Sequence, residues 1–530
     1  YNRTIEPYYY GIKGGSYNPS NPTDYEIERL GTSGTDYLKT SDISKASDQT
    51  FYLDARVNYD RQFNLHHVTG MLMYMQREYR SSVLPERNQG FSGRFTYDYG
   101  QRYLVELNFG YNGTERLAKK ERFEFFPAVS LGWVISNEKF FEPMTKYIDN
   151  LKIRGSYGLV GSDETGLSAG AQHFLYIDQV SLNNIGFTTG VDMNYTLYGP
   201  LVTNYAVVNG GWERVKKLDI GIDLELFRQL TITADYFNEK RYNILLHREA
   251  WPESLGYYTA KPWSNKGKVD NWGIELSVNW RKEFTKDLYV DFRGNFTYTE
   301  NKYVNLDEPV YPYVWKTSTG KPLSRTTGYI AQGLFSSQEE IDNSPTQNLG
   351  STVKPGDIKY RDVNGDGKID GSDQVMISPY GTTPRIQYGL GMNVTYKKFD
   401  FGVFFNGSAK RTIMISGISP FGQSDYNVMQ FIADDYWSES NPNPNAKYPR
   451  LGLTSSQTAN NTVASTYWMR NGNFIRFKTL ELGYKFKYGR VYLNGDNIAV
   501  FSPFKLWDPE LSWNAYPLQR TFNIGVQLNF

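Results

Sequence analysis

A strict alternation of apolar and polar residues constrains the fold of this chain more than any other feature. In LDIGIDLEL, residues 218–226, apolar side chains occupy every second position from Leu218 to Leu226, with Asp219 and Asp223 among the residues between them. At the roughly 100° per residue of an α-helix these positions would scatter, whereas at the roughly 180° of a strand they share one face. The pattern predicts a β-strand with one apolar face and one hydrated face.

The same alternation recurs along the chain. Clear examples are residues 91–99, 103–111, 272–280, 288–298, 386–396 and 399–405. With weaker examples we count about fifteen strands of roughly ten residues, and aromatic residues tend to lie at their ends. A soluble sandwich would also alternate, but aromatic strand ends favour a lipid-facing band with girdles. We therefore predict an all-β fold, an antiparallel up-and-down transmembrane β-barrel.

Connection lengths support a barrel with two different rims. The short connections are 100–102, 227–229, 281–287, 397–398 and 487–489, with 136–150 as a longer member of the same set. The long connections are 159–216, 248–270, 299–384, 407–472 and 499–519. Short and long alternate, as in outer-membrane barrels with short periplasmic turns and long external loops. The last strand ends on Phe530, and the terminal strand of such a barrel ends in the periplasm. Counting back from Phe530 places every short turn on the periplasmic rim and every long loop outside.

The composition excludes several classes of protein. There are 57 basic and 56 acidic residues, a net charge of +1, which argues against nucleic acid as a partner. There is no cysteine, so disulfide scaffolds and thiolate metal sites are excluded. No run of about 18 apolar residues predicts a transmembrane helix.

At the level of motifs, the chain resembles the C-terminal barrel portion of the SusC/RagA-like TonB-dependent outer-membrane transporters. The matching segments include WERVKKLDIGIDLELF (212–227), NKGKVDNWGIELSVNW (265–280), GDIKYRDVNGDGKIDGSD (356–373), VYLNGDNIAVFSPFKLWDPEL (491–511) and YPLQRTFNIGVQLNF (516–530). The resemblance implies energised import of oligosaccharides, or of oligopeptides, across the outer membrane of a Gram-negative bacterium. It also implies a SusD-like surface lipoprotein as a lid.

The chain departs from this family at its N-terminus. We find no signal peptide, TonB-binding segment or plug domain, and about fifteen strands instead of the 22 of such transporters. We therefore expect residues 1–530 to be one C-terminal part of the barrel. Its expected partners are the N-terminal portion with plug and missing strands, TonB through that absent region, and membrane lipid or lipopolysaccharide.

The segment DVNGDGKIDGSD, residues 362–373 within the 299–384 loop, matches a twelve-residue calcium loop. Glycine falls at position 6 (Gly367) and an apolar anchor at position 8 (Ile369). The predicted ligands are Asp362, Asn364, Asp366, the Lys368 carbonyl, Asp370 and Asp373. Aspartate at position 12 is shorter than the usual glutamate, which weakens bidentate binding. A polar turn without metal is the alternative. We expect a structural Ca²⁺, with Mg²⁺ as the other candidate cation.

Aromatic residues in the external loops are candidate substrate contacts. They are Tyr311, Tyr313, Trp315, Trp251 and Trp263. Aromatic faces stack on sugar rings or on a partner, and the alternative is packing within the loops. We further expect Phe421, Tyr426, Trp315 and Trp437 to be among the apolar residues that a lid covers.

Two alternative functions remain open from the sequence. One is a secreted calcium-dependent all-β glycan-binding protein, and the other is a surface glycoside hydrolase stabilised by the calcium loop. We identify no catalytic residues and predict that the protein is not an enzyme. The discriminating observation is whether the alternating apolar faces point outward to lipid or inward to a core.

Overall fold

The computed structural model describes residues 3–4, 7–13, 26–37, 39–40, 47–81, 85–164, 175–207, 210–252, 254, 261–415, 428–452, 454–512 and 515–529. The chain divides into two compact units. The first comprises Tyr1–Leu53 and Gln76–Asn88, and the second comprises Asp54–Met75 and Gln89–Phe530. Among the described residues, no helix is long and apolar enough to cross a bilayer.

The first unit contains two short antiparallel strand pairs before the main sheet begins. Strand β1 (Arg3–Thr4) pairs with β4 (Lys39–Thr40), and β2 (Tyr10–Ile12) pairs with β3 (Ile27–Arg29). These pairs have two or three residues per strand and are separate from the 15-stranded sheet.

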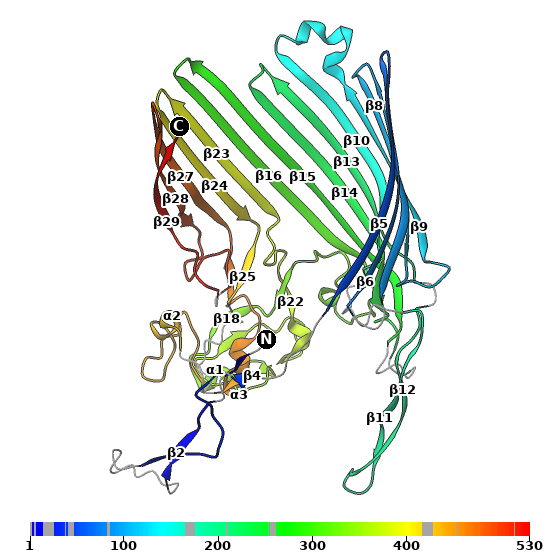
Figure 1. Ribbon diagram of the computed structural model, residues 1–530. Helices are drawn as coiled ribbons and strands as arrows, with labels where there is room; N and C mark the ends of the chain where they lie inside the picture. The colour runs from blue at the N-terminus through cyan, green and yellow to red at the C-terminus, as the bar shows by residue number, and fades with distance from the viewer. Residues whose placement is uncertain are drawn as a thin grey trace. The chain divides into compact units, whose positions relative to one another are not determined.

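The largest structural element is one 15-stranded antiparallel sheet in which each strand pairs with the preceding and the following strand of that sheet (Figure 1). In chain order the strands are β5 (Gln49–Phe63), β6 (His66–Arg80), β7 (Glu86–Tyr99), β8 (Tyr103–Thr114), β9 (Phe123–Val134), β10 (Ile148–Ser162), β13 (Glu213–Leu226), β14 (Leu230–His247), β15 (Trp263–Thr285), β16 (Leu288–Asn305), β23 (Ile386–Tyr396), β24 (Phe399–Ala409), β27 (Phe474–Phe486), β28 (Gly489–Phe501) and β29 (Thr521–Leu528). The predicted strand number and up-and-down order are confirmed.

Strand ends differ from the prediction. The sequence predicts a strand over 272–280, whereas β15 runs over 23 residues from Trp263 to Thr285. Likewise β16 continues to Asn305, so the long excursion that was predicted to begin at 299 begins after that residue. Apolar alternation stops where the wall leaves the apolar band, but the backbone hydrogen bonds between strands continue beyond it.

The apolar faces of the strands are exposed. Ile220 on β13 is 50% exposed, Ile274 on β15 is 45% and Leu482 on β27 is 43%. The register places Ile220 opposite Tyr236 and Gly221 opposite Asp235, so apolar and polar residues separate onto opposite faces. An exposed apolar face is expected of a wall in contact with lipid and excludes a sandwich core made by this sheet.

The two ends of the sheet carry different connections, as Figure 1 shows. Tight turns join β5 to β6, β7 to β8, β13 to β14, β15 to β16, β23 to β24 and β27 to β28; this end is called the tight-turn rim. Phe227 and Arg228 in one of these turns have φ of 55° and 53°, the left-handed backbone that tight hairpin turns require. The opposite end, called the long-loop rim, carries the long connections.

Strands β5 and β29 are the two edges of the sheet. No described residue of β5 pairs with β29, as is expected for a wall of more than fifteen strands. An unpaired edge in lipid leaves backbone groups without hydrogen-bond partners. That further strands close the wall stays a prediction, and Phe530 lies outside the described residues.

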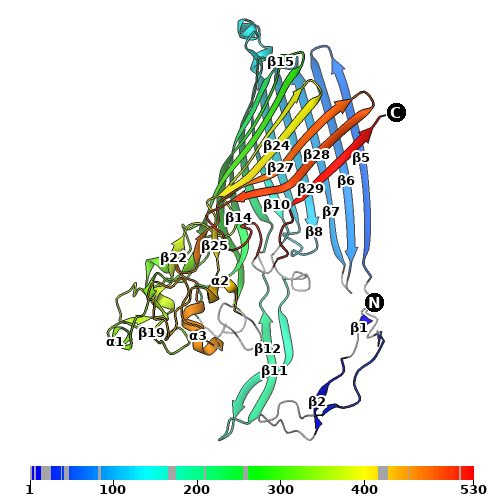
Figure 2. The ribbon, with the colours of Figure 1, turned by 90° about the vertical axis from the view of Figure 1, so that its left-hand side faces the viewer.

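Three long connections fold together around a small buried core. Figure 2 shows these connections below the strands of the sheet. Their elements pair β17 (Thr326–Gly328) with β22 (Val375–Ser378), β18 (Ala331–Leu334) with β20 (Ile358–Tyr360), β19 (Thr346–Gln347) with β21 (Lys368–Ile369), and β25 (Thr412–Met414) with β26 (Met469–Asn471). The helices are α1 (Gln338–Asp342), α2 (Gln430–Ala433) and α3 (Ser455–Thr462). We call this the loop domain; a separate hairpin, β11 (Gln179–Thr189) with β12 (Tyr195–Asn204), follows β10.

The loop domain corrects one prediction. Trp437 is 5% exposed and packs within the chain's own core, so the prediction that it lies on a partner-covered surface is wrong. Trp468 and Ile358 belong to the same core and are 1% and 0% exposed. These connections are long enough to bury their own aromatics. Phe421 and Tyr426 lie outside the described residues.

Candidate functional site

The polar face of the sheet carries a cluster of charges around Arg154 on β10. Its guanidinium lies 3.3 Å from Asp219, 3.2 Å from Asp223 and 2.7 Å from Asp235. A Cβ at Gly221 would lie 2.1 Å from the Asp235 carboxylate, so only glycine leaves room for this cluster. One cation among three carboxylates makes this part of the wall hydrophilic and locally acidic.

A second polar group lies near the tight-turn rim. Arg490 on β28 is paired with Asp400 and Glu481 from two neighbouring strands. These two carboxylates, with Arg293 and Asn494, help to line a hollow of about 470 Å³ on the same face. The polar face therefore has charged, hydrogen-bonding surface over its length, as a solute path or a plug-contacting wall requires.

The predicted calcium loop forms a compact turn within the loop domain. Gly365 and Gly367 have φ of 77° and 80°, the left-handed conformation for which the motif uses glycine. The Asp362 carboxylate accepts hydrogen bonds from the backbone N–H of both glycines, at 2.6 and 2.8 Å. The side chain of Asp362, at position 1 of the motif, therefore lies over the turn.

The other acidic positions are also held by backbone donors. Asp366 accepts from the Lys368 N–H at 2.9 Å, and Asp370 accepts from the Ser372 N–H at 2.7 Å. Hydrogen bonds from Ser372, first from its backbone N–H and then from its side chain, lower the pKa of the Asp370 carboxyl. Asp373 is fully buried and accepts from the Asp370 N–H at 2.9 Å, which closes a capping box.

The donor chemistry of this loop fits a hard cation, but the side chains do not converge. Within the described ranges, no group of three or more His, Cys, Asp or Glu side chains is arranged to hold a metal ion. Each carboxylate oxygen has a second acceptor site besides the one used by a backbone N–H. Asn364 bonds to Asp366 at 2.9 Å. Ile369, the expected apolar anchor, is fully buried in the core of the loop domain, which confirms its role in packing.

The five candidate aromatics fall into separate local groups. Tyr313 and Trp315 stack with ring centroids 4.8 Å apart, and the Trp315 indole donates to the Ser372 carbonyl at 2.8 Å. Tyr313 also accepts from Asn364 at 3.1 Å, so this stack packs on the calcium-like loop. Tyr311 is 38% exposed.

The other two aromatics lie on the β14–β15 connection. Trp263 opens β15 and lies 3.6 Å, centroid to centroid, from the ring of His247, and Trp251 lies 4.9 Å from the Arg248 guanidinium. Tyr313, Trp315, Trp251 and Trp263 thus have partners within the chain, which supports a packing role for these four rings, and a substrate role stays a prediction for all five.

Sequence reasoning missed the polar groups that hold the loop domain together. Asn460 and Asn461 on α3 are fully buried and bond to the Ile358 carbonyl and to Asp357, at 2.9 and 2.7 Å. Asp357 in turn pairs with Arg450 at 2.6 Å. Adjacent asparagines in a polar segment resemble any surface turn, so no local signal distinguished them.

The exposed apolar strand faces, the charged opposite face and the folded long loops together define part of the wall of an outer-membrane β-barrel. Comparison with known protein families supports the same conclusion. The chain matches the family of TonB dependent receptor-like β-barrels over residues 1–498. It belongs to this family and is an integral outer-membrane protein.

Relatives and solved structures support the SusC/RagA-like resemblance. TonB-dependent receptor P3 of Formosa agariphila is 25% identical over 478 residues, covering 83% of this chain and 45% of that protein. SusC of Bacteroides thetaiotaomicron is 27% identical over 469 residues, covering 83% of this chain and 43% of that protein. The chain thus spans about half the length of these relatives. The RagAB peptide transporter structure shares the fold, with a TM-score of 0.66 and 18% identity over 91% of this chain and 55% of that one.

Proposed function

We propose that this chain forms the substrate-conducting wall of a TonB-dependent importer of oligosaccharides or oligopeptides. The observation that carries the proposal is the separation of an exposed apolar face from a charged face around Arg154. Such a wall encloses a hydrated path through lipid. The chain offers no catalytic constellation in its described part, and its relatives are receptors and transporters.

The polar wall accommodates either substrate class. Three carboxylates around Arg154 present acceptors for sugar hydroxyls and equally for peptide N–H groups. The SusC/RagA-like resemblance admits both classes, and the RagAB structure, which shares the fold at 18% identity, is that of a peptide transporter.

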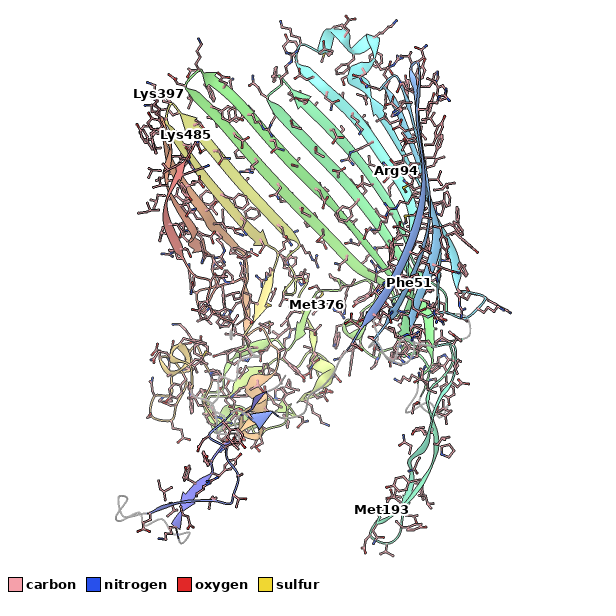
Figure 3. The ribbon with its side chains drawn as sticks, viewed as in Figure 1. Phe51, Arg94, Met193, Met376, Lys397 and Lys485 are labelled. Atoms are coloured by element: carbon pink, nitrogen blue, oxygen red, sulfur yellow. The ribbon has the colours of Figure 1, made fainter. Side chains whose placement is uncertain are left out.

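A surface lipoprotein lid of the SusD type is the partner that we propose at the long-loop rim. The β11–β12 hairpin exposes apolar side chains on a two-stranded ribbon: Leu182 is 80% exposed, Phe187 66% and Met193 67% (Figure 3). Isolated apolar ribbons of this kind are unfavourable in water and mark interaction sites. TonB is the second partner that we propose, as the family name implies.

The experiment is uptake by cells that carry the full-length gene or a deletion of it. Fluorescent oligosaccharides and fluorescent peptides of matched size are offered separately, with and without an uncoupler of the proton gradient. We expect uptake of one class to need both the gene and the gradient. Uptake of both substrate classes by the deletion strain at the rate of the strain with the full-length gene would overturn the proposal.

We also propose that the loop of residues 362–373 binds a structural Ca²⁺. Asp362, Asn364, Asp366, Asp370 and Asp373 would supply side-chain oxygens, and Lys368 would supply its carbonyl. The two left-handed glycines and the buried Ile369 already give the loop its turn and its anchor. A bound cation would offset the mutual repulsion of four carboxylates and fix the loop against Tyr313 and Trp315.

A further inference from the structure

Three neighbouring hairpins place their turns side by side on the tight-turn rim. The sheet order puts β15, β16, β23, β24, β27 and β28 next to one another. Their turns contain Lys286, Lys397, Lys398 and Lys487, and Lys282 precedes the first of them on β15. Figure 3 labels Lys397 at this rim. Five lysines therefore gather along one continuous arc.

These lysines lack ion-pair partners among the residues that the structure describes. Two arginines elsewhere on the rim are paired: Arg102 lies 3.5 Å from Glu138, and Arg228 lies 3.4 Å from Asp149. The arc contains the exposed acids Glu283 and Asp287, fewer than its lysines. The arc thus carries a net positive charge that the protein itself leaves uncompensated.

The same arc presents exposed aromatic rings. Phe284 is 49% exposed, Tyr396 50% and Tyr488 60%. Each lies beneath a lysine ammonium: Lys282 is 5.2 Å from the Phe284 ring centroid, Lys397 is 5.5 Å from Tyr396 and Lys487 is 4.9 Å from Tyr488. The repeated pairing aligns a row of cations with a row of rings.

Rings of this kind lie at the level of lipid headgroups in outer-membrane barrels, whose short turns face the periplasm. Lysine stems run along apolar surface and carry their charge to the aqueous boundary. The ammonium groups are therefore held where the phosphates of the inner leaflet lie. Phosphate is the anion that this boundary supplies in quantity.

We propose that the turns β15–β16, β23–β24 and β27–β28 form a binding site for anionic phospholipid headgroups of the periplasmic leaflet. The aromatics fix the depth of the wall in the bilayer, and the lysines select negative headgroups over zwitterionic ones. This site is independent of the transported substrate and of the calcium loop.

The test uses the full-length transporter, purified in mild detergent and stripped of lipid, with native mass spectrometry as the readout. Phosphatidylglycerol and phosphatidylethanolamine with identical acyl chains are titrated separately. We expect the wild type to prefer phosphatidylglycerol at least fivefold. The K282Q/K397Q/K398Q/K487Q variant should reduce that preference to within twofold, and the corresponding arginine variant should restore it.

The matched control is K119Q/K120Q, which neutralises two exposed lysines in the β8–β9 connection at the opposite rim and should keep the preference. Heat-modifiable electrophoretic mobility checks folding, and K397Q/K398Q, which changes turn residues alone, replaces the quadruple variant if that fails to fold. Inorganic phosphate at equal concentration should not compete. Equal binding of both lipids by the wild type, retention of the preference by the glutamine variants, or full competition by free phosphate would overturn the proposal.

Discussion

Arg476 at the start of β27 forms a salt bridge with both carboxylate oxygens of Asp508 in the last long connection. The Arg476 Nη2 donates to both carboxylate oxygens at 2.7 and 2.8 Å, and the arginine side chain is 3% exposed. Its Nε donates to Glu510 at 2.8 Å. The contact fastens the connection that supplies Phe504 to the loop-domain core.

Removing this contact should loosen the last long connection. Substitution R476M leaves Asp508 and Glu510 without their cation, and breaking a buried pair on one side typically costs about 3–5 kcal/mol. Hydrogen exchange in 502–512 should accelerate accordingly. The control K447M removes an exposed pair with Asp435, 3.3 Å apart, and should cost at most about 1 kcal/mol. Equal exchange rates in R476M and K447M would refute a structural role for the contact between Arg476 and Asp508.

The two faces of β15 should respond oppositely to a charge. Leu276 lies on the exposed apolar face between Trp272 and Trp280, whereas the adjacent Ser277 faces the other way. L276K should reduce the stability of the barrel in bilayers by about 2–4 kcal/mol, and S277K should change it little. Urea titration of folded full-length protein in vesicles measures both. A larger effect of S277K would reverse the assigned faces.

A cavity in the loop domain should destabilise it without affecting the barrel wall. Ile358 is fully buried, and its truncation in I358A should cost about 2–5 kcal/mol of loop-domain stability. V314A, at a side chain that is 85% exposed, should change stability by less than about 0.5 kcal/mol. Limited proteolysis of intact protein separates loop cleavage from barrel unfolding, and comparable cleavage rates in the two variants would contradict the assigned core.

Glu340 should give the loop domain a modest dependence on acid pH. The pKa of Glu340 is lowered chiefly by the hydrogen bond from the Ser336 backbone N–H. The hydrogen bond from the Ser336 hydroxyl and the ion pair with Lys359 lower it further. Because the folded pKa is below the unfolded value of about 4.3, the ionised form stabilises the fold above that pH. This contribution is lost as pH falls through the folded pKa.

The E340Q variant should therefore be less stable than the wild type at pH 7 by about 0.2–1 kcal/mol, the range for partly exposed pairs. The difference should vanish below the folded pKa. The fraction of protein that resists proteolysis across pH 3–7 measures this difference in stability. E339Q, at an exposed neighbouring residue, is the control. A difference that persists unchanged at low pH would rule out the assigned cause.

Calcium should protect the loop of residues 362–373 from opening. In the intact protein, exchange of Ca²⁺ for EGTA should speed hydrogen exchange in this loop at least tenfold, because four carboxylates then repel one another. D366N should abolish the calcium effect, whereas E339Q on α1 should keep it. Identical exchange with Ca²⁺ and with EGTA would show that the loop is a polar turn without metal.

The sequence by itself determined the wall. Period-two alternation at segments such as 218–226 requires one lipid-facing and one wet face, because adjacent strand residues point to opposite sides. Alternation also predicted the number of strands, and the lengths of the connections predicted the two different rims. It predicted the glycine positions of the 362–373 loop, whose φ values follow from local backbone chemistry.

Tertiary structure alone decided where strands end and what the long loops do. Beyond the apolar band, β15 and β16 continue on backbone hydrogen bonds that carry no side-chain pattern. Trp437, Ile358 and Asn461 come from different connections or distant positions and meet in one core, so no local window reveals their burial. Arg154 finds its carboxylates on two other strands through register. Contacts between residues far apart in sequence depend on that register, which the amino-acid pattern of one segment does not encode.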